Sequence, residues 1–269
     1  MSESSRLSSP LAEPLRSAAP RCLVMVATYN ELENLPHLVE GIEQSLPTAD
    51  ILVVDDNSPD GTGRWCDERS RHDARLQCLH RTGKQGLGAA VLAGLEYAVE
   101  HDYDVVINMD ADLSHPPAVL PQLVAQLFPA PDAVPREAND RPADLAIGSR
   151  YVRGGVVENW PWQRRCLSWM VNFYSRHVLR IPARDCSGGY RAYRVSLLRS
   201  FNAASMESRG YAFFEEQLWR LHRAGARIVE TPITFVDRRA GESKVNMGEM
   251  WRSAFFLLRL GLRTWLTSC

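Results

Sequence analysis

The chain has 269 residues, of which 45% are hydrophobic and 23% charged, and its formal net charge is -1. This composition is typical of a soluble globular protein and excludes collagen-like, fibrous and wholly disordered chains. A near-neutral charge provides no overall field that would attract nucleic acid, so we expect no nucleic-acid partner.

Residues 1–21 are predicted to form a flexible N-terminal tail. They are rich in Ser and Pro and contain no apolar run typical of a secretory signal. No uncharged apolar stretch approaches the roughly 18 to 20 residues needed to cross a bilayer, so we expect a chain that does not span a membrane. The six cysteines lie far apart without a C-x-x-C motif, which favours reduced thiols in the cytoplasm over a zinc or redox site.

From residue 22 to residue 128, short apolar runs alternate with amphipathic stretches. Strands are predicted at 22–27, 51–55, 77–80 and 104–110, and helices at 31–46, from about 60, at 86–101 and at 117–128. Strands separated by helices indicate parallel βαβ units. We therefore predict an α/β fold whose functional site lies at the carboxyl ends of the strands.

The second half of the chain is less regular. Residues 129–143 are rich in Pro and charge, which predicts an exposed loop. A buried strand is predicted at 144–149, a turn-forming segment at 187–190 and a later strand at 227–237. Residues 250–266 have the pattern of an amphipathic helix.

An acidic motif, Asp110-Ala111-Asp112, directly follows the apolar strand at 104–110. Alternate side chains of an extended chain face the same way, so both carboxylates can point into one crevice. Carboxylate oxygens favour Mg²⁺ or Mn²⁺, which commonly bridge a protein and a diphosphate. A solvated strand-to-loop turn is the simpler alternative, but the strand context favours a metal site.

Two further segments follow predicted strands. In the acidic segment at 55–62, Asp56 is assigned to a nucleotide and Asp60 to a helix N-cap. The glycine-rich segment at 81–88 lacks the Walker A pattern, but its backbone and Lys84 are suited to a diphosphate.

Arginines are concentrated between Arg150 and Ser200. Ten arginines against Glu158 and Asp185 give this segment a charge of +8, which leaves -9 for the rest of the chain. An anionic ligand and a solvated basic face are both consistent with this pattern.

Taken in chain order, the motifs resemble those of the polyprenyl (dolichyl) phosphate mannose synthase group of inverting family 2 glycosyltransferases. The motifs are ATYNE (27–31), VVDDNSPDGT (53–62), GKQGLGAA (83–90), DADLSHPP (110–117), GSRYVRGG (148–155), SGGYRAYR (187–194) and FVDRRAGESK (235–244). The resemblance implies a GT-A fold over 22–244, with a Rossmann-like, mostly parallel sheet flanked by helices. Residues 245–269 would then form a C-terminal amphipathic helix at a membrane surface.

The resemblance also implies a role for each matching residue. Metal binding is implied for Asp110, Asp112 and Ser114, with Mg²⁺ or Mn²⁺, although the family often has Gln where Ser114 stands and Pro where Ala27 stands. Donor binding is implied for Ala27, Tyr29, Glu31, Val54, Asp56, Lys84, Asp110, Ala111, Asp112, Arg238 and Lys244. Arg150, Arg164, Ser168 and Arg238 would surround the acceptor phosphate and, with Asp112, form the catalytic set. Arg164 and Ser168 share a helix face because they are four residues apart.

Two more acidic residues match the family, and each has two interpretations. Asp185 and Glu216 would orient sugar hydroxyls, or would form ion pairs with Arg191 and Arg220 respectively.

The function implied by the resemblance is transfer of mannose from GDP-mannose to a polyprenyl (dolichyl) phosphate with inversion. The alternatives are transfer of another sugar, such as glucose from UDP-glucose, and a non-catalytic protein that binds lipid surfaces. We expect a cytoplasmic protein held peripherally on a membrane by the C-terminal helix, in which Arg252, Arg259 and Arg263 share one face. A helix that packs on the core is the alternative for this segment.

Overall fold

The computed structural model describes residues 19–130, 141–237 and 247–266. Most of the predicted tail at 1–21, the centre of the predicted loop at 129–143, and both Arg238 and Lys244 lie outside these ranges. The predicted domain boundaries therefore stay predictions.

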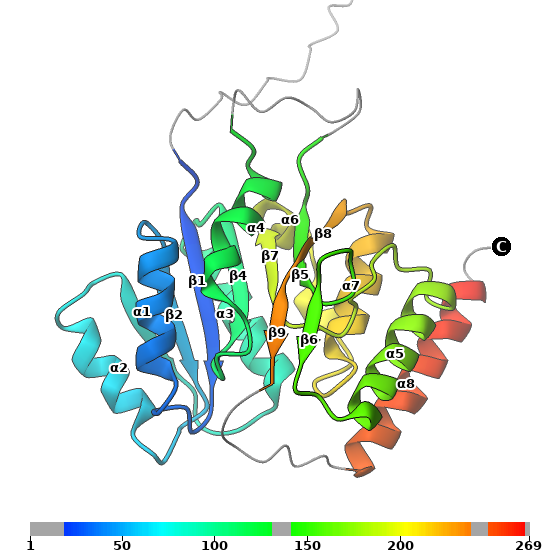
Figure 1. The fold of residues 1–269 in the computed structure, drawn as a ribbon, viewed down its shortest axis with the longest axis horizontal. Coiled ribbons are helices and arrows are strands. Elements are labelled where there is room, and N and C mark those ends of the chain that lie inside the picture. Colours follow the sequence, from blue (N-terminus) through cyan, green and yellow to red (C-terminus); the bar gives the residue numbers. More distant parts are fainter. Residues whose placement is uncertain (1–18, 131–140, 238–246, 267–269) are drawn as a thin grey trace, which may run out of the picture.

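A central sheet of seven strands runs through the described residues (Figure 1). Its order is β3 (Leu76–His80), β2 (Asp50–Asp55), β1 (Cys22–Thr28), β4 (Val105–Asp110), β7 (Arg191–Arg194), β5 (Leu145–Ser149) and β8 (Ile228–Pro232). Strand β7 is antiparallel to β4 and β5, and the other neighbouring strands are parallel. The mostly parallel sheet is confirmed, whereas the turn-forming segment was not expected to lead into a strand.

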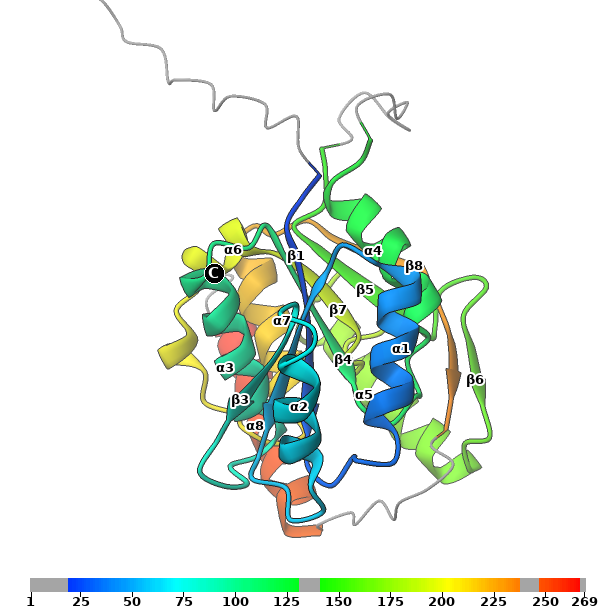
Figure 2. The ribbon, with the colours of Figure 1, turned by 90° about the vertical axis from the view of Figure 1, so that its left-hand side faces the viewer.

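Helices cover both faces of the sheet, as Figures 1 and 2 show. Successive residues of β1 point to opposite faces: Leu23 and Met25 pack in one core with α3 (Leu87–Glu100) and α7 (Phe213–Arg223). Val24 and Val26 pack in the other core with α1 (Leu35–Ser45) and α4 (Leu120–Leu127). Burial on both faces explains why the strand is a continuous apolar run.

The remaining helices and 3₁₀ turns of the described chain flank this sheet or connect its strands. They are α2 (Thr62–Ser70), the 3₁₀ turns η1 (Pro117–Val119) and η2 (Ala203–Ser205), α5 (Trp162–His177), α6 (Val195–Arg199) and α8 (Met247–Leu266).

The single strand predicted at 227–237 is wrong, because the chain changes sheets at Ile233. Strand β8 ends at Pro232 in the central sheet, and β9 (Thr234–Val236) pairs with β6 (Val156–Glu158) in a separate two-stranded sheet. The Ile233 N–H donates to the Ser149 carbonyl and the Ile233 carbonyl accepts from Val156. One residue thus joins the central sheet to the smaller one.

Helix α8 packs directly on α5 and α7. The Tyr174 hydroxyl of α5 donates to the Leu257 carbonyl at 3.1 Å, and Trp219 Nε1 donates to Thr264 Oγ1 at 2.8 Å. A Cβ atom at Gly261 would lie 2.2 Å from the Tyr174 hydroxyl, so the close approach requires glycine. The alternative interpretation of this segment, a helix that packs on the core, is therefore correct for one face of α8.

The opposite face of α8 is apolar and exposed. Its most exposed members are 58–78% accessible: Trp251, Phe255, Leu258, Leu262 and Leu266. Helix α5 lies beside α8 (Figure 1) and exposes Trp162, Trp169, Met170 and Phe173. We call these nine residues the α5–α8 apolar face. Two arginines of the predicted basic face, Arg259 and Arg263, remain partly exposed but form ion pairs with Glu207.

Candidate active site

The predicted motifs meet at the carboxyl edge of the central sheet. In the register of the parallel strands, Thr28 of β1 pairs with Asp55 of β2, and Ala27 pairs with Asp110 of β4. The loops that follow these three strands therefore share one edge, where α/β sheets commonly bind ligands.

One side of this edge carries the residues predicted to bind a nucleotide. Lys84 Nζ lies 4.3 Å from the ring centroid of Tyr29, which brings two predicted donor residues together. The Asp56 carboxylate, 7% exposed, forms an ion pair with Arg81, and Arg81 also donates to Gln85 Oε1 at 2.9 Å. Arg81 was not predicted, although it stands in the glycine-rich segment. Its guanidinium lies next to Asp56, a residue predicted to bind the nucleotide.

The other polar residues of these loops hold the backbone. Asp60 accepts from the Leu32 N–H at 3.0 Å and the Thr62 N–H at 2.9 Å, so its role is structural. The predicted N-cap position is wrong by one residue, because the N-cap of α2 is Gly61. Burial by itself would raise the pKa of Asp60, but these hydrogen bonds outweigh it and lower the pKa. The Glu31 carboxylate accepts from Asn34 Nδ2 at 2.9 Å.

Two predicted donor residues have buried side chains, and their contact with a donor stays a prediction. The side chains of Val54 and Ala111 are 0% and 4% exposed and pack in the two cores on either side of the sheet. They are small apolar groups whose burial stabilises the strand ends. Only their backbone atoms are left for a contact with a donor.

The acidic motif is held by a buried histidine and a buried serine. The Asp110 N–H donates to His115 Nδ1 at 3.0 Å, and His115 Nε2 lies 3.6 Å from Asp110 Oδ2. The Ser114 N–H and hydroxyl both donate to Asp112 Oδ1, at 3.1 and 2.6 Å. Ser114 thus positions Asp112, and its predicted direct metal contact stays a prediction. His115, stacked on Tyr190 at 4.9 Å, was not predicted.

The residues of the acidic motif fit a hard divalent cation. They offer two carboxylates from one strand end, and the Asp110 side chain is 36% exposed at the edge. Carboxylate oxygens are the ligands that Mg²⁺ and Mn²⁺ prefer.

Across the edge, Arg150 forms a buried ion pair with Asp185. Arg150 Nε and one terminal nitrogen donate to the two Asp185 oxygens at 2.7 and 2.6 Å, and the same terminal nitrogen donates to Ser187 Oγ at 2.9 Å. Burial would raise the pKa of Asp185, but the guanidinium outweighs it and lowers the pKa. The ion-pair interpretation of Asp185 is confirmed with a different partner, Arg150 in place of Arg191.

Arg164 and Ser168 lie beside this pair on α5. Arg164 donates to Asp237 at 2.7 Å and stacks on Trp160, with 4.2 Å from its guanidinium carbon to the ring centroid. The guanidinium carbon of Arg150 lies 5.2 Å from the same ring. The Ser168 hydroxyl lies 2.7 Å from the Tyr151 hydroxyl. The structure therefore brings three predicted acceptor residues around Trp160 and Tyr151.

Comparisons with known proteins show the family to which the chain belongs. Residues 23–201 match the family model described as glycosyl transferase family 2. The chain is a family 2 glycosyltransferase. It is 45% identical over 242 residues to the undecaprenyl-phosphate mannosyltransferase of Micrococcus luteus, covering 90% of this chain and 94% of the relative. It is also 45% identical over 244 residues to the polyprenol monophosphomannose synthase of Mycolicibacterium smegmatis, covering 90% and 88%.

Solved structures confirm the GT-A fold of this glycosyltransferase. The mannosyltransferase PcManGT from Pyrobaculum calidifontis, in complex with GDP-Man and Mn²⁺, superposes with a TM-score of 0.56 at 19% identity, over 93% of this chain and 65% of that one. Glucosyl-3-phosphoglycerate synthase from Mycobacterium tuberculosis, in complex with Mn²⁺, UDP and phosphoglyceric acid, superposes with a TM-score of 0.61 at 16% identity. This match covers 91% of this chain and 78% of that one. At these identities the likeness shows the fold alone. Among the described residues of this glycosyltransferase, none of the helices is long and apolar enough to cross a membrane.

Two consecutive glutamates lie in the first turn of α7 of the glycosyltransferase, and they differ in environment. Glu216 forms an ion pair with Arg220 at 2.7 Å and accepts from the Ser208 N–H at 2.7 Å, which confirms the ion-pair interpretation. Glu215 was not predicted. Its side chain is 2% exposed, and its Oε2 has no hydrogen-bond partner among the described residues. Burial raises the pKa of Glu215 from 4.5 to about 7, although Arg191 opposes the shift.

Glu215 makes the stability of the glycosyltransferase depend on pH. Because its pKa is higher in the folded state, the folded protein favours the neutral acid, and this stability is lost as pH rises from about 4.5 through 7. The shift corresponds to about 3 kcal/mol. We expect Glu215→Gln to reduce the fall in melting temperature between pH 5 and pH 8, measured by differential scanning fluorimetry. The exposed Glu96→Gln is the matched control, and equal pH profiles for the two variants would contradict the prediction.

One cluster at the β3 end of this edge, where His80 pairs in register with Asp55, was also missed. Ligand atoms of Asp67, Cys78 and His80 lie within 4.8 Å of one another, and His80 Nε2 is bonded to Asp67 Oδ1 at 2.8 Å. Cysteine spacing did not indicate it, because the residues come from α2 and β3.

Proposed function

We propose that this glycosyltransferase transfers mannose from GDP-mannose to a polyprenyl phosphate, with inversion at the anomeric carbon. The observation that carries the proposal is that the carboxyl edge of the central sheet holds acidic residues on one side and predicted acceptor residues on the other. Asp110 and Asp112 follow β4 on one side, and Arg150, Arg164 and Ser168 gather around Trp160 and Tyr151 on the other. The names of the two 45%-identical relatives support the same sugar and the same class of acceptor.

The acceptor phosphate requires no general base. The second pKa of a phosphate monoester is near 6, so its oxygens are already ionised at neutral pH. One such oxygen attacks the anomeric carbon as the bond from that carbon to the diphosphate oxygen breaks, and GDP leaves with the electron pair. A single displacement of this kind inverts the configuration.

The protein's own residues contribute position and charge. Guanidinium groups match phosphate oxygens in pairs, so Arg164 and Arg150 would orient the acceptor, with Ser168 as a further hydrogen-bond partner. Lys84 and Arg81 would stabilise the negative charge of the leaving diphosphate. Asp110 and Asp112 would hold Mg²⁺ or Mn²⁺, which when bound neutralises charge on the diphosphate.

The α5–α8 apolar face would place the enzyme peripherally on the cytoplasmic surface of a membrane. Trp251 and Phe255 of α8 and Trp169 of α5 are all more than half exposed, at 71%, 70% and 63%. Aromatic and aliphatic side chains of an amphipathic helix enter the boundary between headgroups and acyl chains. This location brings the site to an acceptor whose polyprenyl tail stays in the bilayer.

The proposal is tested by product analysis. Purified full-length protein is incubated with Mn²⁺ or Mg²⁺, a short polyprenyl phosphate and, in parallel, GDP-mannose, UDP-glucose and other nucleotide sugars. We expect a mannosylated lipid phosphate, identified by mass, with GDP-mannose alone. Transfer from UDP-glucose in preference to GDP-mannose would show that the proposed donor is wrong. The absence of transfer from any donor would contradict the whole proposal.

Arg164 is expected to act on the acceptor side. Arg164→Ala removes a charge-assisted phosphate contact worth about 1.5–3 kcal/mol, which corresponds to a roughly 10- to 150-fold weaker acceptor. Affinity for GDP should change less than about 3-fold. The two ligands are titrated separately by calorimetry. Arg165→Ala is the control, because Arg165 is on the same helix and donates to the Val157 carbonyl; equal weakening of both ligands by Arg164→Ala would contradict the assignment.

A further inference from the structure

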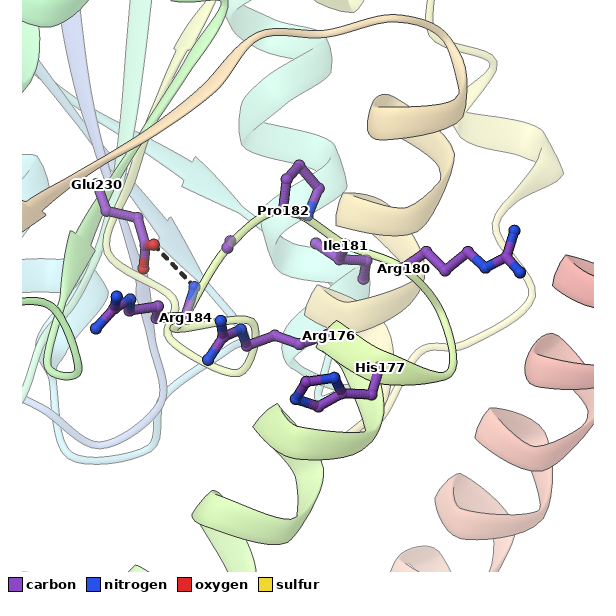
Figure 3. Close-up of a pocket in the computed structure, with 8 residues that line it drawn as sticks. Arg176, His177, Arg180, Ile181, Pro182, Arg184 and Glu230 are labelled. Carbon is purple, nitrogen blue, oxygen red and sulfur yellow. Dashed lines mark hydrogen bonds between the residues drawn. The ribbon is translucent and has the colours of Figure 1, made fainter.

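A cationic pocket lies at the C-terminal end of α5 (Figure 3). It encloses about 390 Å³ and is lined by Arg176, His177, Arg180, Ile181, Pro182, Ala183, Arg184 and Glu230. In Figure 3 the side chains of Arg176 and Arg184 extend toward the same side, whereas Arg180 extends toward α8. We call Arg176 and Arg184 the arginine pair. The function proposed above does not use this pair.

The charge of the arginine pair is not balanced inside the pocket. Within the described parts of the chain, neither Arg176 nor Arg184 has a carboxylate oxygen within 4.0 Å, in contrast to Arg150 and Arg164. Glu230 is the one carboxylate in the lining, and it accepts from the backbone N–H groups of Arg184 and Asp185, at 2.8 and 2.9 Å. Two arginines that line one pocket without an ion-paired carboxylate offer a site for an anion.

The arginine pair is separate from the acceptor site but connected to it. A second cavity, of about 260 Å³, is lined by Tyr151, Trp169, Asn172, Phe173, Arg176 and Arg184. Tyr151 is bonded to Ser168 at the acceptor end. Ser168 and Arg176 are both on α5 and eight residues apart, which corresponds to about 12 Å along the helix.

The surroundings of the arginine pair indicate what kind of anion it binds. Trp169, Phe173 and His177 stack in a row on α5, with centroid distances of 5.3 and 4.4 Å, and the row leads from the α5–α8 apolar face to the pocket. The guanidinium carbon of Arg180 lies 4.1 Å from the Trp265 ring centroid at the end of α8. Arginines at the border of an exposed aromatic surface match the headgroup level of a bilayer.

A structural role explains only part of this cluster. Cations in the last turn of a helix interact favourably with its C-terminus, which accounts for Arg176 and His177. Arg184 lies seven residues beyond the end of α5, so this effect does not explain its position in the pocket.

We propose that Arg176 and Arg184 bind the phosphodiester group of an anionic phospholipid, at a second anion site distinct from that of the acceptor phosphate. The site would orient α5 on the membrane. The second cavity would then connect this site to the acceptor residues Tyr151 and Ser168. This inference rests on the peripheral membrane contact in the proposed function.

The test measures binding of the full-length protein to vesicles. Partition into phosphatidylcholine vesicles is compared with partition into vesicles that also contain phosphatidylglycerol, by sedimentation. Each basic residue near an anionic surface contributes about a factor of five, so the double variant Arg176→Gln/Arg184→Gln is expected to bind the anionic vesicles about 30-fold more weakly. The control, Arg64→Gln/Arg71→Gln, removes the same charge from α2, on the opposite side of the molecule from α5 and α8 (Figure 1).

Three outcomes decide the inference. A selective loss in the arginine-pair variant supports it, and equal losses in the two double variants overturn it. Titration with inorganic phosphate and glycerophosphoglycerol distinguishes a soluble anion: tight binding of either, with no preference for anionic vesicles, also overturns it. Mannose transfer by the unmodified protein to a water-soluble acceptor is measured separately. If the protein transfers mannose but does not prefer anionic vesicles over phosphatidylcholine vesicles, this inference fails and the proposed function stands.

Discussion

Asp112→Asn is expected to abolish sugar transfer while leaving the protein folded. The amide lacks the negative charge that holds a hard cation, so we expect a loss on the order of 1,000-fold, equivalent to about 4 kcal/mol of transition-state stabilisation. The fold should survive, because an Asn oxygen can still accept from the Ser114 N–H and hydroxyl that bond Asp112 Oδ1. Initial rates with GDP-mannose are measured over a range of Mn²⁺ concentrations.

The matched control is Asp102→Asn. Asp102 forms a surface ion pair with Arg199, its side chain is 80% exposed, and its positive φ of 56° suits Asn. Its transfer rate should stay within about 2-fold of the unmodified protein, since exposed ion pairs contribute at most about 1 kcal/mol to stability. Full activity of Asp112→Asn, or full activity in excess EDTA, would refute the metal assignment.

The sheet was predictable wherever its strands are apolar on both faces. The runs in β1 and β4 pack against helices on either side, so hydrophobicity alone located them. Strand β7 escaped prediction because its four residues begin and end with arginine. Arg191 is 0% exposed because the carbonyls of Cys186, Gly188 and Phe214 accept its hydrogen bonds. Cys186 and Gly188 are close to Arg191 in the sequence, but Phe214 is 23 residues away, and only the fold brings all three carbonyls to the guanidinium. The local sequence therefore indicated a turn.

The candidate site was predictable as a set of motifs but not as a set of contacts. Asp110 and Asp112 stand in an acidic motif after an apolar strand, and this pattern by itself predicts a divalent-cation site. His115 and Arg81 were missed because a single histidine or arginine carries no spacing signal, and their roles depend on a strand end and on Asp56. The same limit applies to Asp185, whose partner Arg150 follows β5 and is 35 residues away.

The C-terminal helix shows why amphipathic patterns allow two interpretations. Helix α8 has apolar residues on more than one side, so the pattern was consistent with a core-packing helix and with a surface helix. Leu260 packs inside while Leu262 is 67% exposed, and Gly261 between them permits contact with Tyr174. The core-packing interpretation is confirmed for one face, and contact of the exposed face with a membrane stays a prediction.

Arg150→Met is expected to destabilise the protein strongly, because it leaves the Asp185 carboxylate buried without its counterion. Removing one partner of a buried pair costs about 3–5 kcal/mol, which corresponds to a fall in melting temperature of roughly 6–20 °C. The unfolding transition is measured by circular dichroism. An unchanged transition would contradict the energetic role of the pair.

A second variant separates this structural role from the predicted contact of Arg150 with the acceptor. Arg150→Met/Asp185→Asn removes both charges, and the Asn oxygen can still accept one of the backbone N–H groups, of Arg150 or Gly188, that bond Asp185. We expect most of the lost stability to return, because no charge is then buried alone. Acceptor binding should stay roughly 10-fold or more below that of the unmodified protein, because one of the guanidiniums that would grip the phosphate is absent. If the double variant instead regains full acceptor binding along with its stability, Arg150 acts only through Asp185, and the acceptor site reduces to Arg164 and Ser168 among the described residues.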